Sequence, residues 1–167
     1  MKYICYLFKI SIFKSIYYSY RFRGRVLVGH KTKILCKRNS KIKISNGGML
    51  SIGVKTNLPQ GTILEMDKNS TFLVNGRVSI FKGSKVVIGQ NAVLSISDGT
   101  FINEHSKLVC QNRVDIGRNC AISWDVDIMD TDYHTIVVDG KKKDHLGTVV
   151  IEDDVWVGCK CIILKNS

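Results

Sequence analysis

Apolar residues recur at every sixth position through the central part of the chain. Between residues 114 and 128, Ile116, Ile122 and Ile128 are six residues apart, and each follows a small or apolar residue two positions earlier. An amphipathic helix would repeat its apolar residues every three or four positions, and a long strand every second position. Short strands joined by corners repeat every six residues, which is a signature of β-helices. The pattern therefore predicts a coil with flat faces.

The same spacing extends in both directions, in steps of six residues or of eight where a corner is wider. The expected inward positions are Val74, Ile80, Val86, Ile88, Leu94, Ile96, Ile102, Leu108, Val114, Ile116, Val149, Ile151, Val155, Val157, Cys161 and Ile163. Corners require a positive φ or a short polar side chain. Such residues stand where corners are expected, at Gly53, Gly89, Asn91, Gly117, Asn119 and Gly158. A β-sandwich would turn about every 8–12 residues, which fits this spacing less well.

The length of 167 residues suits a single domain. Residues 26–72 are strand-like but irregular, and the regular coil takes over at Phe72. We therefore divide the chain into an N-terminal segment, residues 1–45, and a hexapeptide-repeat β-helix domain, residues 46–167. The one interruption of the repeat predicts an inserted loop at residues 129–148.

Positive charge is concentrated in the N-terminal segment. Residues 1–45 contain 12 Lys and Arg residues and no Asp or Glu, whereas the rest of the chain contains 13 Lys and Arg and 14 Asp and Glu residues. The formal net charge of +11 is thus a property of this segment. No recognition motif accompanies the charge, so we expect no nucleic-acid partner.

Residues 1–25 combine aromatic side chains with Lys and Arg. Lys9 and Lys14 interrupt the apolar run, which falls short of the ~20 residues of a membrane span, and no signal-peptide cleavage site follows it. As a helix, this segment would spread its polar residues all round, without one apolar face. We interpret it as a cap that covers the open edge of the first coil. Peripheral contact with an anionic membrane surface is the alternative.

The chain has six cysteines. Cys120 and Cys161 fall at inward positions, where cysteine acts as a small apolar residue. Because no secretion signal precedes them, we expect reduced thiols and a cytoplasmic protein, or one at the inner face of the membrane. Cys159 and Cys161 would face opposite sides of a strand, which argues against a metal site there. We expect no metal cofactor.

The interrupting loop begins with an acidic stretch around His134. Histidine titrates near neutral pH and can take a proton from a hydroxyl group. Asp130 or Asp132 could hold its ring in one tautomer. A solvated loop histidine explains the spacing equally well.

The order of these motifs resembles that of the hexapeptide-repeat acyltransferases. The matching segments are residues 116–123, Val126-Asp127-Ile128, residues 130–134, Val149-Val150-Ile151 and Asp154-Val155-Trp156-Val157-Gly158. The chain is most similar to maltose/galactoside O-acetyltransferases and to those that modify capsule and lipopolysaccharide. The resemblance implies a left-handed parallel β-helix, a homotrimer with active sites between subunits, acetyl-CoA as donor, and a glycan acceptor on a surface polysaccharide or its precursor.

The resemblance also implies roles for single residues. His134 matches the general base, and Asn103 matches the asparagine that orients the acceptor and supports the developing charge. The other implied contacts are Trp156, Gly158 and Cys159 for the donor, and Trp124, Asp125, Asp130 and Asp132 for the acceptor. Without the resemblance, Asn103 is a corner residue and Trp156 covers the exterior of the coil.

Two other functions stay open. Family members continue after the I-L-K segment with a glycine and a further coil, whereas Asn166 stands at that glycine and the sequence stops at Ser167. A fragment or a natural short form with an incomplete donor site would have a structural or interaction role instead. A carbonic anhydrase of the same fold needs three histidines on one zinc ion, for which His105, His134 and His145 are the candidates.

Overall fold

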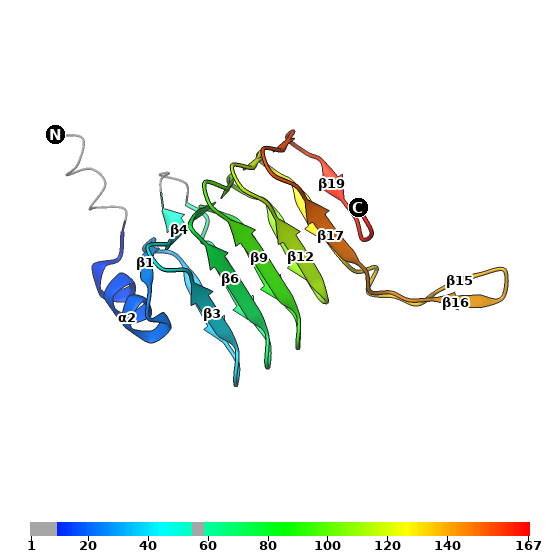
Figure 1. The fold of residues 1–167 in the computed structure, drawn as a ribbon, viewed down its shortest axis with the longest axis horizontal. Helices are drawn as coiled ribbons and strands as arrows, with labels where there is room; N and C mark the ends of the chain where they lie inside the picture. Colours follow the sequence, from blue (N-terminus) through cyan, green and yellow to red (C-terminus); the bar gives the residue numbers. More distant parts are fainter. Residues whose placement is uncertain (1–9, 55–58) are drawn as a thin grey trace.

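The computed structural model describes residues 10–54 and 59–167. It is a coil of short parallel strands, with one helix at the end where the chain begins and a hairpin that projects from the other end (Figure 1). Three sheets form the walls of the coil. Each of the first five turns contributes one strand to each wall, and the last described turn contributes a strand to two walls. This is the predicted left-handed parallel β-helix.

The walls are numbered in the order in which the chain meets them. The first wall contains β1 (Arg25–Val28), β4 (Met49–Val54), β7 (Arg77–Phe81), β10 (Phe101–Ile102), β13 (Ala121–Ile122) and β18 (Trp156–Val157). The second contains β2 (Lys33–Cys36), β5 (Ile63–Met66), β8 (Lys85–Ile88), β11 (Lys107–Cys110), β14 (Asp127–Met129) and β19 (Ile162–Ile163). The third contains β3 (Lys41–Ile44), β6 (Thr71–Asn75), β9 (Val93–Ser97), β12 (Arg113–Ile116) and β17 (Thr148–Ile151).

The core is a set of aliphatic columns, one rung above the next. In the first wall, Ile80, Ile102, Ile122 and Val157 are register partners in successive strands, and all four are buried. The predicted inward residues from Val74 to Ile151 are buried as expected. Cys161 was predicted to point inward, but it is exposed, because it lies in the last described coil and no further coil covers it.

Asparagine, rather than glycine, takes the left-handed conformation at several corners. Asn91 and Asn119 have φ angles of 62° and 52°, which asparagine tolerates better than most residues. Gly117 instead allows a close approach, since a Cβ atom there would lie 2.6 Å from the backbone nitrogen of Asp153. Glycine is therefore required at position 117 because the next coil lies too close for a side chain, and not because of a positive φ.

The coil begins at Arg25, well before the boundary drawn at residue 46 from the sequence. Val28 and Ile34 already have the six-residue spacing, but the inward residues Ile52 of β4 and Leu64 of β5 are twelve residues apart, which obscures the repeat in this part of the chain. Helix α2 (Ile12–Phe22) precedes them and packs on β1. For the described part of residues 1–25, the prediction that a helix there lacks one apolar face was wrong, because Phe13, Tyr17 and Tyr20 share an exposed side. Residues 1–9 of that prediction lie outside the described residues. No helix formed by the described residues is long and apolar enough to cross a membrane.

The predicted loop at residues 129–148 contains a β-hairpin. Strands β15 (Ile136–Val138) and β16 (Lys141–Lys143) pair antiparallel and project away from the coil (Figure 1). Asp139 and Gly140 join them with φ angles of 51° and 70°, as a two-residue type I′ turn requires. A bridge between Thr131 and Leu146 closes the base. We call residues 131–146 the arm.

A buried carboxylate fastens the arm to the coil. Asp130 is fully buried, and its two oxygens accept hydrogen bonds from the backbone N–H groups of Gln111 (2.7 Å) and Asn112 (2.8 Å). Its carbonyl oxygen accepts the N–H of Gly147 at 2.8 Å, where the chain returns to the coil. Asp130 therefore holds both ends of the arm on the preceding rung.

Shortening one buried side chain tests whether the aliphatic residues stack in the interior of the coil. Leu94 is fully buried, so Leu94→Ala should lower the free energy of unfolding by about 2–5 kcal/mol through lost burial and a cavity. The matched control is Leu35→Ala, because Leu35 is 52% exposed on an outward face, and it should cost less than about 1 kcal/mol. Urea unfolding followed by circular dichroism measures both, and equal losses would contradict a stacked interior.

Removal of the Asp130 carboxylate tests how the arm is held. In Asp130→Asn, one carboxylate oxygen becomes an NH₂ group, which cannot accept a hydrogen bond from the backbone N–H that faces it. One buried N–H then loses its acceptor, so the free energy of unfolding should fall by about 1–3 kcal/mol. The arm should also be cleaved faster by limited proteolysis. Asp139→Asn at the exposed tip is the control and should change neither measurement. Unchanged cleavage of the arm in Asp130→Asn would show that other contacts hold it.

Candidate functional site

The predicted site residues fall into two groups at opposite ends of β14. Asn103, Trp124, Asp125, Gly158 and Cys159 lie at the corner between the first and second walls, with Trp156 on the strand that leads into it. Asp130, Asp132 and His134 follow the other end of β14, where the arm leaves the coil. We call the first group the coil corner and the second the arm base.

At the coil corner, three successive rungs are in register. The N–H of Asn103 donates to the carbonyl oxygen of Ile122 at 2.9 Å, and the N–H of Ser123 donates to that of Val157 at 3.0 Å. Asn103, Ser123 and Gly158 therefore occupy the same place in consecutive coils. The Asn103 carbonyl oxygen also accepts a hydrogen bond from Ser84 Oγ (2.9 Å), so its backbone position is well defined.

Two tryptophans border this column. Trp156 is 76% exposed, and its Nε1–H donates to Ser123 Oγ at 3.0 Å. Trp124 is also exposed, one residue after Ser123. Ser123 was not among the predicted site residues, although its place after Ile122 matches that of Asn103 after Ile102. The repeat register was the signal that could have identified it.

Asp125 adopts the left-handed backbone conformation in the tight turn of this corner. Its φ is 54° and that of His105, at the equivalent turn, is 62°. His105 Nδ1 and Asp125 Oδ1 are 4.0 Å apart, both partly exposed. Their exposed side chains add a polar rim to the coil corner.

At the arm base, His134 is exposed and the two predicted orienting carboxylates have other partners. Both oxygens of Asp130 accept backbone N–H groups, and Asp132 pairs with Lys165 of the last coil at 2.6 Å. Among the described residues, neither forms a hydrogen bond to the His134 ring. The expected carboxylate–imidazole contact is therefore not formed. The two aspartates fix the backbone on which His134 stands.

The cysteines near these groups do not form a thiol centre. Burial, and then the charge of Asp130, raise the pKa of the Cys110 thiol, so it stays protonated at neutral pH. Cys159 and Cys161 are both exposed, and Cys159-Lys160 forms a turn with Lys160 at a φ of 59°, rather than the predicted strand. In the described part of the chain, no group of three His, Cys, Asp or Glu side chains could hold a metal ion.

The candidate zinc histidines are also divided between the two groups. His105 lies at the coil corner, whereas His134 and His145 lie in the arm. Within one chain they therefore do not converge on one point.

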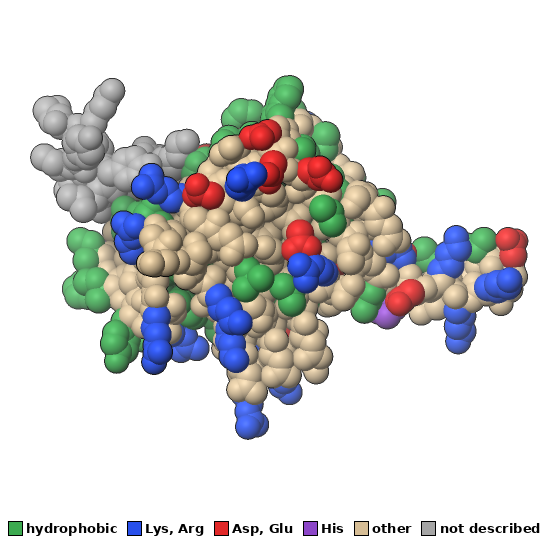
Figure 2. Space-filling view, in the orientation of Figure 1, with side chains coloured by type: hydrophobic (Ala, Val, Ile, Leu, Met, Phe, Trp, Pro, Cys, Tyr) green, Lys and Arg blue, Asp and Glu red, His purple; other side chains and the backbone are tan. Residues whose placement is uncertain are grey.

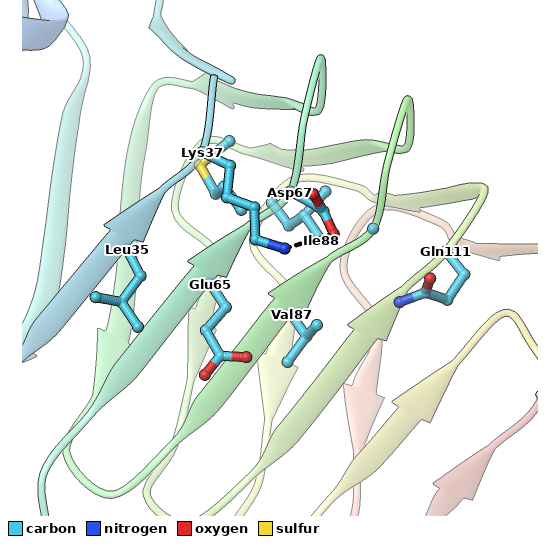
Figure 3. Close-up of a pocket in the computed structure, with 9 residues that line it drawn as sticks. Leu35, Lys37, Glu65, Asp67, Val87, Ile88 and Gln111 are labelled. Carbon is cyan, nitrogen blue, oxygen red and sulfur yellow. Dashed lines mark hydrogen bonds and ion pairs between the residues drawn. The ribbon is translucent and has the colours of Figure 1, made fainter. Parts of the chain in front are cut away.

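A shallow pocket of about 320 Å³ lies on the outer face of the second wall (Figure 3). Leu35, Glu65 and Val87 line its floor, and the ion pair between Lys37 and Asp67, 3.1 Å long, borders it. Gln111 lines it as well, and the backbone N–H of Gln111 is one of the donors to Asp130. The pocket thus reaches the arm base, although it contains none of the predicted site residues.

Comparison with known proteins gives one similar curated sequence and one similar solved structure. No family model matches the chain. The chain is 24% identical over 157 residues to an uncharacterised 24.8 kDa protein in the cps region of Klebsiella pneumoniae, covering 94% of this chain and 65% of that relative. A search of solved structures gives the polysialic acid O-acetyltransferase OatWY, at 18% identity and a TM-score of 0.39, over 81% of this chain and 72% of that one. The chain spans about two thirds of the length of the curated relative. Its own strands and their six-residue repeat make it a hexapeptide-repeat protein with the left-handed β-helix fold.

Proposed function

We propose that this protein is an O-acetyltransferase that moves an acetyl group from acetyl-CoA to a sugar hydroxyl. The observation that carries the proposal is the exposed imidazole of His134 in the arm, which interrupts the coil between β14 and β17, on a backbone held by the buried Asp130. Motifs that resemble those of hexapeptide-repeat acyltransferases surround this interruption, in the same order. A flexible, solvated loop would not need a buried carboxylate to hold both of its ends.

His134 acts as the general base. It removes the proton from the acceptor hydroxyl while the oxygen attacks the carbonyl carbon of the thioester. The side-chain amide of Asn103 donates a hydrogen bond that stabilises the developing negative charge. The ester C–O bond forms, the C–S bond breaks, and the departing thiolate takes its proton from the His134 imidazolium. Atoms and charge balance without a metal ion or a covalent acyl-enzyme.

The coil corner provides the surface for the donor. Space beside Gly158 is open, since a Cβ atom there would meet only Cys161 Sγ, at 3.8 Å. Trp156 offers an exposed indole whose N–H is already bonded to Ser123. The exposed Cys159 follows Gly158 in the same turn. These features suit a narrow pantetheine chain lying along the edge of the coil.

The two groups come together between subunits of a homotrimer. Within one chain, β14 separates Asn103 from His134, and the arm points away from its own coil (Figure 1). An isolated two-stranded hairpin is at best marginally stable in water, and the Ile136–Val138 strand is exposed. Contact with a neighbouring subunit would cover this strand and deliver His134 to the partner's coil corner.

The acceptor is a surface polysaccharide or its precursor. The relative in a cps region supports this class, and the exposed tryptophan Trp124 at the coil corner is a surface on which a sugar ring can stack. Asp125, beside it, offers a carboxylate to sugar hydroxyls. Asp130 and Asp132 position the arm instead of contacting the acceptor.

Replacement of His134 tests the chemistry. His134→Ala should lower kcat by at least about 100-fold, since general base catalysis contributes 10²–10⁴, with release of free CoA thiol in the presence of glycans as the measurement. His30→Ala, at the opposite end of the coil, is the matched control and should retain full activity. Turnover that is unchanged in His134→Ala would refute the role of His134. Absence of turnover in the unmodified protein would favour a non-catalytic β-helix.

Mixed trimers test whether the site is shared between subunits. His134→Ala and Asn103→Ala homotrimers should each be inactive. Co-expression in equal amounts should restore about a quarter of the activity, because each mixed cyclic trimer contains one interface with both residues intact. A mixture that stays as inactive as its components would place both residues in one subunit's site.

A further inference from the structure

Helix α2 places its serines, together with Tyr18 and Phe22, against the coil. Ser11, Ser15 and Ser19 are four residues apart and therefore lie on one face of the helix. The backbone N–H groups of Val26 and Val28, on the edge strand β1, donate to Ser19 Oγ and Ser15 Oγ, both at 2.9 Å. The backbone N–H of Ser11 donates a third hydrogen bond between the helix and β1, to the carbonyl oxygen of Val28 at 2.8 Å. These serines satisfy the edge that would otherwise attract another strand.

The side of the helix opposite the coil is also apolar and lies in solvent. Its exposed residues are Ile12, Phe13, Ile16, Tyr17 and Tyr20, which we call the α2 surface. Phe13 is 88% exposed and Tyr20 is 87% exposed. In the space-filling view, hydrophobic side chains gather at the end of the molecule formed by α2, with Lys and Arg beside them (Figure 2). Single exposed apolar residues are ordinary, but a continuous aromatic and aliphatic stripe indicates an interaction surface.

The charges around the stripe have one sign. Arg21 donates to the hydroxyl of Tyr17 at 3.2 Å and lies 5.8 Å from the centre of the Phe22 ring. Arg23 follows at the C-cap. Lys14 Nζ bonds the carbonyl oxygens of His30 and Thr32, both at 2.9 Å, and residues 10–45 contain no Asp or Glu. Aromatic rings with neighbouring cations match the boundary between acyl chains and anionic headgroups.

We propose that the α2 surface docks on an anionic phospholipid bilayer. A second copy of the chain is a poorer occupant, because a two-fold contact would bring two segments of like charge together. The six strands of the first wall separate β1 from β18 by about 24 Å at 4.8 Å per strand. Docking through α2 therefore keeps the coil corner and the arm base in water, at a fixed distance from the lipid.

Vesicle sedimentation of the full chain tests this docking. The protein should bind vesicles of phosphatidylcholine mixed with phosphatidylglycerol, should bind phosphatidylcholine alone weakly, and should be released by high salt. The double substitution Phe13→Ser and Tyr20→Ser should lower the partition coefficient at least about tenfold, because it removes two large apolar groups from the contact. Residues 1–9 are left unchanged in every variant, so a loss is attributable to α2.

Val150→Ser is the matched control, since Val150 is an exposed apolar residue on the third wall near the opposite end of the coil. It should bind vesicles like the unmodified protein, and unchanged urea unfolding of the double variant should show that the fold is intact. Failure of the unmodified protein to bind anionic vesicles would overturn the proposal, as would equal binding by the double variant. Self-association that disappears in the double variant, without vesicle binding, would assign the surface to a second copy.

Discussion

The structure depends on the stacking of aliphatic side chains between successive coils. One coil cannot bury its own apolar residues, because each wall contributes only a short strand, so burial comes from the rung above and the rung below. Parallel register places like positions over one another, as in the Ile80–Ile102–Ile122–Val157 column. Any residue that points inward must therefore be apolar and of suitable size, and only corners and outward positions are free to vary.

This constraint decides where chemistry can reside. The outward faces are flat, and the described site residues accordingly lie at a corner and at the base of the arm. Asn103, Ser123 and Gly158 form a column because the same register that stacks the core also aligns the residues that follow it. The arm leaves the coil beyond the far end of β14, so its histidine is separated from that column within its own chain.

The ends of the coil pose a separate problem, because an edge strand has unpaired backbone groups. At the first coil, Ser15 and Ser19 supply side-chain oxygens to β1. Because the serines occupy much of the side that meets the coil, only Tyr18 and Phe22 among the described helix residues pack against the core there. The other apolar residues of the helix, including Phe13 and Tyr20, are exposed. Capping and surface chemistry are thus two results of the same helix orientation.

Several features were visible in the sequence and others were not. The hexad predicted the coil and its buried positions, since a repeat that sets local geometry also sets the stacking. It placed the start of the coil too late, because the inward residues Ile52 and Leu64 on either side of the corner between β4 and β5 are twelve residues apart. The sequence predicted a loop at residues 129–148, although Asp139-Gly140 between apolar and basic runs is a hairpin signal.

The sequence by itself determined the fold, the buried positions and the residues that stand at its interruption. Only the tertiary structure decided what those residues contact. The repeat specifies neighbours along and between coils, but the partners of Asp130, Asp132 and the helix serines come from other coils, through long-range contacts that no local spacing encodes. Gln111, Lys165 and β1 are such partners. Because of them, Asp130 and Asp132 hold the arm instead of facing the acceptor, and the helix that caps β1 also exposes an apolar surface.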